Sequence, residues 1–593
     1  MKQYHLLLLF PLFFWACNGS KQDSEFPRQG KGGIYYGGVF RMNETEGIRS
    51  LYPLNITDAY SHRITNQIYE GLVKLDQKDL SIIPCIAERW EINDSATSFT
   101  FYMRKGVKFH DDPCFPNGKG REVTANDFKY CFNKVCEADI NNQGFWVFKG
   151  KVQGADEYFQ STVDGRPLPD GVSGIKIIDD YTVQINLKEP FASFLNLLVT
   201  PFCWVFAKEA FDKYGIDMRE HCVGTGPFFL KTLKHGEAVI LSRNTDYWGV
   251  DEYGNKLPYL EAIKFTFIPE KRAELLEFKK GQLDMVFQLP PEMYDEVIGE
   301  LEQVSEELKP YDIQIVPSLS TQFYGFLHTN EVFNNKIVRQ AFNYAIDRES
   351  ICTYTLSGEG TPAFYGLIPP SFKDYEYQKI TGYKYDPEKA RILLAQAGYP
   401  DGKGFPKITL QLNSGGTINI RVAEVMQKQL KDNLGIEVSL NVIPWPQHLE
   451  ALETGKALFW RMGWLADYND PENFLNLFYS IHIPKKPDEK SYINSTRYSN
   501  PAFDSLLQAA LRETDVKKRF EIYRQADQLI VDEAAVLLIY YDENTRLLQP
   551  YVKNFPQNPM ELRDLGKVWL QPEEAKGAEG GQPGRRTARK KGA

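Results

Sequence analysis

The sequence predicts an α/β protein built from more than one lobe. Its 593 residues exceed what a single hydrophobic core usually supports, so two or three lobes are expected. Hydrophobic residues make up 42% and charged residues 25% of the chain, the ordinary balance of a globular protein. Residues 99–103 and 183–187 alternate apolar and polar side chains, which predicts half-buried strands. Such strands are interleaved with helical patterns, as in α/β lobes.

The helical patterns have clear ends. Asp386 can cap a helix and Pro387 fits its first turn, so a helix is expected to begin there and to end at Gly398. Apolar residues at four-residue spacing predict a second helix over 422–434, which a glycine ends. Alternating apolar residues over 436–442 predict the strand that follows it.

The N-terminus has the pattern of an export signal. A positively charged start precedes an apolar stretch over 6–16, which is too short to span a bilayer but suits the core of a signal peptide. A small residue before Cys17 resembles the bacterial lipobox, in which the cysteine is acylated. We expect a lipoprotein signal peptide over 1–17, a lipidated Cys17 and a tether over 18–31. A plain secretory signal with an incidental cysteine is the alternative.

Seven cysteines follow Cys17, and an odd number leaves at least one free thiol in an oxidising compartment. Cys114, Cys131 and Cys136 lie close enough in the sequence for a bridge within this group, although the pairing stays open. The others are Cys85, Cys203, Cys222 and Cys352.

Composition and motif spacing argue against several function classes. The formal net charge of −9 disfavours a nucleic-acid binder, which needs a basic face. The eight histidines include no pair at the i, i+4 spacing that holds zinc on one helix face. The chain also contains no phosphate-binding glycine loop, no nucleophile elbow and no CxxC pair. We therefore expect no metal, no cofactor and no catalytic centre, which favours a binding function over catalysis.

A series of motifs then runs through the chain in order. They are Ile68–Val73 (IYEGLV), Ile83–Trp90, Phe99–Asp111, Thr124–Phe128, Gly224–Phe228, Arg243–Trp248, Gly281–Asp284, Val338–Arg348 and Asn500–Asp504. In this order they resemble the family 5 extracellular solute-binding proteins, the peptide- and nickel-binding receptors of ABC importers, over about residues 32–570. The chain departs from the family over residues 112–122, which lengthen a usually tight turn.

The resemblance implies a periplasmic-binding-protein-like α/β fold of type II, cluster C. This fold has two main lobes, an extra lobe and a hinged cleft. Lobes I and III would close over the ligand about two connecting strands. The expected parts are lobe I (32–59, 176–270 and 536–571), lobe II (60–175), lobe III (271–535) and a disordered basic tail (572–593).

Residues 461–472 are similar to the ligand-reading segment of the oligopeptide-binding branch. In that branch an aspartate at the position of Asp467 pairs with the ligand's α-ammonium, and an arginine at the position of Arg461 meets its carboxylate. Gly463 and Leu465 lie where the backbone pairs with an extended peptide. The expected peptide-binding residues are Asp467, Arg461, Gly463, Trp464, Leu465, Tyr324 and Tyr541.

Each of these residues also has a structural explanation. Asp470 already provides a cap for the helix predicted next, which leaves Asp467 without that duty, but an ordinary turn aspartate would explain it too. Arg461 could pair with a neighbouring acid, and the aromatic residues could be core packing. The functional hypothesis has its own physical basis, because a buried ammonium is costly unless a carboxylate pairs with it.

The resemblance implies a periplasmic receptor that captures small peptides and delivers them to an ABC permease without catalysis, and the lipobox-like sequence before Cys17 adds a lipid anchor. Its expected partners are the peptide, the permease–ATPase complex of the inner membrane and the bacterial cell membrane itself. No nucleic acid is expected, and the protein is expected to be a monomer. The alternatives are a nickel-chelate or haem receptor of the same fold, a ligand sensor without an importer, and a hydrolase with an unrecognised site.

Overall fold

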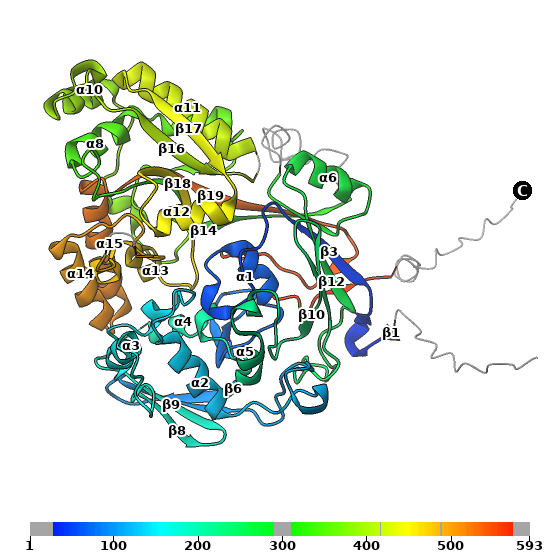
Figure 1. The fold of residues 1–593 in the computed structure, drawn as a ribbon. Coiled ribbons are helices and arrows are strands. Elements are labelled where there is room, and N and C mark those ends of the chain that lie inside the picture. Colours follow the sequence, from blue (N-terminus) through cyan, green and yellow to red (C-terminus); the bar gives the residue numbers. More distant parts are fainter. Residues whose placement is uncertain (1–27, 192, 290–309, 416, 487–488, 573–593) are drawn as a thin grey trace, which may run out of the picture.

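The computed structural model describes residues 28–191, 193–289, 310–415, 417–486 and 489–572, which form an α/β protein with three main sheets (Figure 1). The expected signal peptide, including Cys17, and nearly all of the expected tail lie outside these residues. Part of the expected tether is described: β1 (Arg28–Gln29) pairs with β2 (Tyr35–Tyr36). No helix in the described ranges is long and apolar enough to cross a membrane.

The first sheet joins segments from distant parts of the chain. Its order is β10-β11-β12-β3, with β12 and β3 parallel and the other neighbours antiparallel. The strands are β3 (Val39–Glu44), β10 (Phe228–Lys234), β11 (Ala238–Arg243) and β12 (Ala262–Phe267). Helix α1 (Ala59–Thr65) follows β3 toward the centre of the molecule (Figure 1). This sheet forms the centre of the expected lobe I.

The second sheet is antiparallel and joins strands from the expected lobe II to strands just beyond its expected end. Its order is β6-β7-β9-β8. The strands are β6 (Ala87–Ile92), β7 (Ser98–Met103), β8 (Ile175–Asp179) and β9 (Thr182–Asn186), with helices α2 (Ala125–Val135) and α3 (Ala155–Val163). The strands predicted over 99–103 and 183–187 are confirmed as β7 and β9, and they pair with each other. Because β9 bonds to β7, the sheet continues to Asn186, and the boundary expected at 175/176 divides it.

The third sheet has seven strands and forms the upper lobe of Figure 1. Its order is β13-β19-β14-β18-β16-β17, with β15 on β19. The strands are β13 (Met285–Phe287), β14 (Asp312–Phe326), β15 (Thr361–Pro362), β16 (Ile408–Asn413), β17 (Val438–Ile443), β18 (Phe459–Leu465) and β19 (Val536–Leu548). The helices are α8 (Lys336–Ala345), α9 (Arg348–Ser350), α10 (Pro387–Gln396), α11 (Thr417–Leu434), α12 (Trp445–Glu453), α13 (Glu472–Leu475), α14 (Pro501–Arg512) and α15 (Val516–Asp532).

The helix ends predicted in this lobe are confirmed. The Asp386 carboxylate accepts the Lys389 N–H at 2.9 Å, and α10 follows it directly. Gly398 has a φ of +97°, a left-handed conformation that suits the residue after a helix. Helix α11 ends at Leu434 and is followed by β17, as the periodicity of the sequence predicts.

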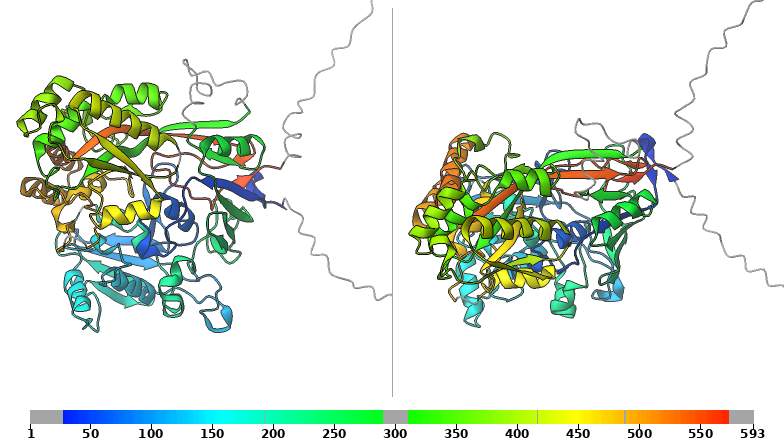
Figure 2. Two further views of the ribbon diagram at one scale, coloured as in Figure 1. Left: turned by 45° about the horizontal axis from the view of Figure 1, so that its top comes forward. Right: turned by 90° about the horizontal axis from the view of Figure 1, so that it is seen from above.

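Strands β14 and β19 run from one lobe into the other. They pair from Asp312 opposite Leu548 to Gly325 opposite Val536, with register shifts midway, and Figure 2 (right) shows them side by side along the molecule. At one end β13 joins β19 and lies beside β3, where Arg41 and Asp284 form an ion pair at 2.5 Å. At the other end β14 pairs with β18. Strands β14 and β19 therefore connect the two ends of the molecule.

This arrangement shifts two further expected boundaries. Strand β19 belongs to the seven-stranded sheet, although the segment from 536 was expected in lobe I. Helix α6 (Lys271–Lys279) lies beside the first sheet, although the segment from 271 was expected in lobe III (Figure 1), and β13 after it pairs with β19 and also contacts β3. The pairing of β19 with β14 decides the position of β19. The remaining short elements are α4 (Phe194–Leu197), α5 (Lys208–Tyr214), β4 (Val73–Leu75), β5 (Ile82–Pro84), β20 (Val552–Lys553) and β21 (Trp569–Leu570).

The bridge considered within Cys114, Cys131 and Cys136 is absent, because all seven cysteines of the described residues are free thiols. Cys131 lies on the buried side of α2, where its Sγ contacts the Phe206 carbonyl oxygen at 3.4 Å. Cys136 follows at the end of that helix and is also fully buried. Spacing in the sequence did not reveal that these thiols remain unpaired.

Candidate functional site

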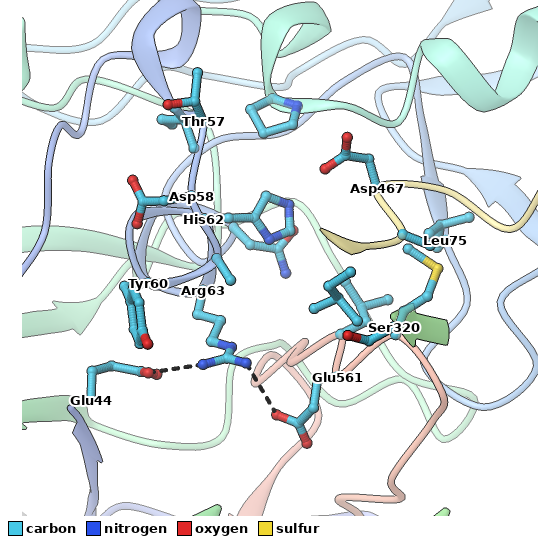
Figure 3. Close-up of a pocket in the computed structure, with 18 of the residues that line it drawn as sticks. Glu44, Thr57, Asp58, Tyr60, His62, Arg63, Leu75, Ser320, Asp467 and Glu561 are labelled. Atoms are coloured by element: carbon cyan, nitrogen blue, oxygen red, sulfur yellow. Dashed lines mark hydrogen bonds and ion pairs between the residues drawn. The ribbon is translucent and has the colours of Figure 1, made fainter. Parts of the chain in front are cut away.

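A cavity of about 300 Å³ lies where the lobes meet (Figure 3). Its wall contains residues of helix α1, of strand β18 and the loop after it, and of strands β14 and β19. The short helical turn over Pro201–Cys203, which packs against α2, and the residue after it contribute Phe202 and Trp204. Because the wall is shared between lobes that two strands connect, a ligand held here contacts both sides of a hinge.

Strand β18 presents an open edge to this cavity. On one side it pairs with β14 along its whole length, from Phe459 to Leu465. On its other side β16 pairs only with Phe459 and Trp460. Within the described part of the chain, residues 461–465 therefore have no strand neighbour on that side, and all of them line the cavity. An unpaired strand edge offers backbone donors and acceptors to an extended ligand.

Asp467 lies just beyond the end of β18 and carries an unpaired carboxylate oxygen. Its backbone N–H donates to Asn473 Oδ1 at 3.0 Å, and the Trp464 indole N–H donates to the same oxygen at 2.7 Å, which fixes the loop. The buried Oδ2 of Asp467 has no hydrogen-bond partner among the residues described. Burial raises the pKa of Asp467 to about 7, although the Asn473 amide lowers it. Such a carboxylate is stabilised by an incoming cation.

Asp470 rather than Asp467 lies at the start of the helix that the sequence predicts, which leaves the Asp467 carboxylate free of that role. Asp470 Oδ1 accepts the Glu472 N–H at 2.9 Å at the start of α13, and its Oδ2 accepts the Ser193 hydroxyl at 2.6 Å. Asp470 therefore fills the local structural role. Asp467 faces the cavity without such a duty.

Arg461 is held by neutral partners. One terminal nitrogen donates to Asn413 Oδ1 at 3.3 Å, and the other donates to Gln322 Oε1. The Gln322 amide in turn donates to Asp542 Oδ2 at 2.6 Å. Gly463 makes room for this arrangement, because a Cβ there would lie 2.5 Å from the Gln322 side chain. The guanidinium thus faces the cavity in a fixed position with its charge bonded only to amides.

The structure brings together most of the residues expected at the site but not all. Asp467, Arg461, Gly463, Trp464 and Leu465 line the one cavity. Tyr324 and Tyr541 do not, and each is only 3% exposed. The Tyr324 ring packs against Phe459 with centroids 5.9 Å apart, and the Tyr541 hydroxyl donates to the Gly366 carbonyl at 2.7 Å.

The physical reason is the alternation of side chains along a strand. Asp542, next to Tyr541 on β19, points into the cavity, so its neighbour points to the opposite face. Tyr324 lies farther along β14, where that strand is covered by the aromatic core. The sequence alone does not show which face of its strand an aromatic residue near a lobe junction occupies.

A buried ion network on the cavity wall was not found from the sequence. Glu44 accepts from Arg63 at 2.9 Å and from Arg563 at 2.8 Å, and Arg563 also pairs with Glu561 at 2.6 Å (Figure 3 shows Glu44, Arg63 and Glu561). These charges compensate one another. Their residues come from opposite ends of the chain, so no local signal could have joined them.

The cavity also contains a histidine from α1. His62 stacks on Trp204 with ring centroids 5.4 Å apart. Burial, together with the charge of Arg63, lowers the pKa of His62 to about 4, so the ring is neutral at pH 7. No group of three or more His, Cys, Asp or Glu side chains that could hold a metal ion occurs in the described residues.

Comparison with known proteins relates this architecture to transport receptors. The family model of bacterial extracellular solute-binding proteins, family 5 (middle), matches residues 81–482. The chain is similar to the periplasmic oligopeptide-binding protein OppA of Escherichia coli, with 28% identity over 525 residues, 87% of this chain and 89% of that protein. It is also 29% identical over 556 residues to heme-binding protein A of Haemophilus influenzae, covering 92% of this chain and 94% of that protein.

A solved structure shows the same fold. The ABC transporter-associated periplasmic binding protein DppA from Helicobacter pylori, in complex with peptide STSA, is similar with a TM-score of 0.76 and 26% sequence identity. The likeness covers 91% of this chain and 99% of that one. The predicted type II periplasmic-binding-protein fold is therefore confirmed.

Proposed function

The chain belongs to family 5 of the bacterial extracellular solute-binding proteins, and we propose that it captures small peptides in the cavity between its lobes and delivers them to an ABC importer. One observation carries this proposal. An uncompensated carboxylate, Asp467, stands at the end of an open strand edge inside that cavity. An extended peptide has a matching arrangement, because its terminal ammonium precedes a backbone that needs hydrogen-bond partners once water is excluded.

The bound peptide extends along β18. Its α-ammonium pairs with Asp467, and its backbone bonds to the edge at Gly463 and Leu465. Trp464 forms part of the wall, and Arg461 meets a carboxylate of the ligand. Since the ligand contacts both sides of the cavity, binding shifts the population toward the closed arrangement of the lobes about β14 and β19. The closed form is then recognised by the permease.

The protein acts outside the cytoplasm as a monomer held to the bacterial cell membrane by acyl chains on Cys17. The lipobox-like sequence before that cysteine supports the anchor. Acyl chains contribute about 0.8 kcal/mol per buried methylene, so several of them hold a folded body at a bilayer. In cells fed radiolabelled palmitate, we expect label on the wild-type protein and none on C17S. Equal labelling of the two would contradict the anchor.

The protein binds its ligand without chemical change. A peptide incubated with it should be recovered intact in a one-to-one complex. Native mass spectrometry of protein purified without a denaturing step tests the ligand class, and the expected result is a complex that releases small peptides on activation. Recovery of neither peptides nor any other amine-bearing solute would oppose the proposal.

A haem receptor is the second candidate, because heme-binding protein A is among the similar proteins. The charges of the cavity argue against it. Haem carries two anionic propionates, which would face the uncompensated carboxylate of Asp467. We expect no change in the absorption spectrum of hemin when this protein is added, whereas a shifted spectrum saturating at one equivalent would favour the haem receptor.

A further inference from the structure

The two ends of the described chain lie side by side at one corner of the molecule. Strand β1 begins at Arg28 and pairs with β2, and β21 ends two residues before Pro572. The Tyr35 ring of β2 and the Trp569 ring of β21 have centroids 5.9 Å apart. Figure 1 shows β1 at the edge of the molecule opposite α10 and α14. The chain before residue 28 and the chain after residue 572 therefore join the folded body at neighbouring points.

Both of these segments carry residues that suit a membrane surface. Cys17, the proposed site of acylation, lies eleven residues before Arg28. Five cations fall within seven positions beginning thirteen residues after Pro572: Arg585, Arg586, Arg589, Lys590 and Lys591. At no more than about 3.5 Å per residue, the two segments can reach about 40 and 45 Å from the body. An acyl anchor and a cationic cluster can thus meet the same bilayer.

The cationic cluster is exceptional for this chain. The whole sequence has a formal net charge of −9, and the three glutamates that follow residue 572 all precede the cluster, within 573–579. Basic clusters next to a membrane anchor bind anionic lipid headgroups, and the attraction grows with each lysine or arginine. Acyl chains and a basic cluster are also the two signals that together give stable attachment, where one alone is weak.

The folded body adds a ridge at the same corner. The ridge consists of the turn over 31–33 and the loop over 250–256. The Lys31 N–H donates to Asn255 Oδ1 at 2.9 Å, and the Asn255 amide donates back to the Lys31 carbonyl oxygen at 3.0 Å. The Tyr36 hydroxyl of β2 donates to the Lys256 carbonyl oxygen at 2.8 Å. These bonds hold the ridge on the strands beside which both chain ends lie.

The surface of the ridge combines apolar and basic side chains. Val250 is 59% exposed and Tyr253 is 49% exposed. Lys31 and Lys256 are exposed beside them, together with one acid, Glu252. Single exposed apolar residues are ordinary on a protein surface. A tyrosine and a valine between lysines, at the corner where a proposed lipid anchor arrives, have the composition of a membrane interface.

We propose that this corner docks on a bilayer surface rich in anionic phospholipid. Residues 585–591 bind the headgroup phosphates, and the ridge lies in the interface with Val250 and Tyr253 inserted among the headgroups. The contact rests on the proposed location outside the cytoplasm, and it requires neither the acyl chains nor a bound peptide. It determines which end of the body faces the membrane, which an acyl chain on a tether does not.

Flotation with lipid vesicles tests this contact. The protein is the mature chain without acyl chains, residues 18–593, which keeps every described residue. Vesicles of phosphatidylcholine are compared with vesicles of equal parts phosphatidylcholine and phosphatidylglycerol. In about 0.1 M salt we expect binding to the anionic vesicles to be at least about a hundredfold tighter. In about 1 M salt this preference should disappear, because the screening length falls from about 10 Å to about 3 Å.

Three variants assign the contact to its parts. In R585S/R586S/R589S/K590S/K591S, affinity for the anionic vesicles should fall at least about tenfold. In V250S/Y253S it should fall about fivefold, because the apolar side chains no longer insert. The control removes five exposed lysines near α10 and α15, on the opposite side of Figure 1, and should bind as the wild type does: K384S/K403S/K407S/K517S/K518S.

Each outcome decides one part of the proposal. Equal binding of the wild type to both kinds of vesicle, or binding to neither, would overturn the docking surface. Undiminished binding by the five-residue variant of 585–591 would remove the role of that segment, and undiminished binding by V250S/Y253S would remove the role of the ridge. An equal loss in the control would show a response to total charge instead of a site. Peptide binding and palmitate labelling of Cys17 are measured separately, so the proposed function can stand or fall independently.

Discussion

Replacing Asp467 with asparagine should weaken peptide binding far more than any local loss of contact would. The substitution keeps the shape of the side chain and leaves the backbone bond to Asn473, 3.0 Å long, in place. It removes the charge that matches the ligand's ammonium. Breaking a buried ion pair by removing one partner costs about 3–5 kcal/mol, which corresponds to a loss of roughly 150- to 5,000-fold in affinity.

The protonation state of Asp467 in the free protein changes the expected loss of binding free energy only slightly. With a pKa of about 7, the carboxyl is half ionised at pH 7. Ionising the remainder on binding costs about 0.4 kcal/mol, well below the loss expected from the substitution. The orphan Oδ2 also means that no hydrogen bond within the described protein has to break before the ligand arrives.

A double-mutant cycle provides the assay. Affinities of the wild type and D467N are measured by calorimetry for Ala-Ala-Ala and for its N-acetylated form, which lacks the ammonium. We expect the variant to lose affinity for the free peptide, and both proteins to bind the acetylated peptide with similar weak affinity. The coupling energy then reports the pair itself. Undiminished binding of the free peptide by D467N would refute the electrostatic account of this site.

Three further results are expected. Because the α-ammonium of the ligand needs ionised Asp467, whose pKa is about 7, the affinity for peptide should fall as the pH decreases below 7, by about tenfold between pH 6 and pH 5. Calorimetry in buffers of different ionisation enthalpy should show proton release on binding, and an affinity that does not change with pH would oppose this. Arg461→Gln should weaken the binding of peptides with a free C-terminus by about tenfold or more and leave the binding of their C-terminal amides unaffected. An equal loss of affinity for both would assign Arg461 a structural role. Arg49 and Glu453 link two lobes through a buried bidentate ion pair. Glu453→Gln should therefore reduce the affinity for all peptides by about tenfold or more and increase the radius of gyration of the unliganded protein in small-angle scattering. An unchanged radius of gyration would show that this ion pair does not hold the lobes together.

Local signals in the sequence were sufficient to predict many of the helices and strands. The cap at Asp386, the end of α11 and the alternation along β7 each depend on residues within one or two turns, where propensity and periodicity act directly. The same is true of the segment after β18. Asp470 could be assigned to a helix start from its neighbours, which singled out Asp467 as the aspartate without a local duty.

The tertiary structure decided what distant residues do together. The sequence by itself determined an α/β protein with motifs of the solute-binding family, and it singled out Asp467 and Arg461 as candidate ligand-binding residues. Only the fold placed Asp58 on the same wall as Asp467, turned Tyr541 away from the cavity and joined β14 to β19 between the lobes. The reason is physical: capping and periodicity act over a few residues, whereas strand pairing and burial join segments hundreds of positions apart and decide which side of each strand meets the ligand.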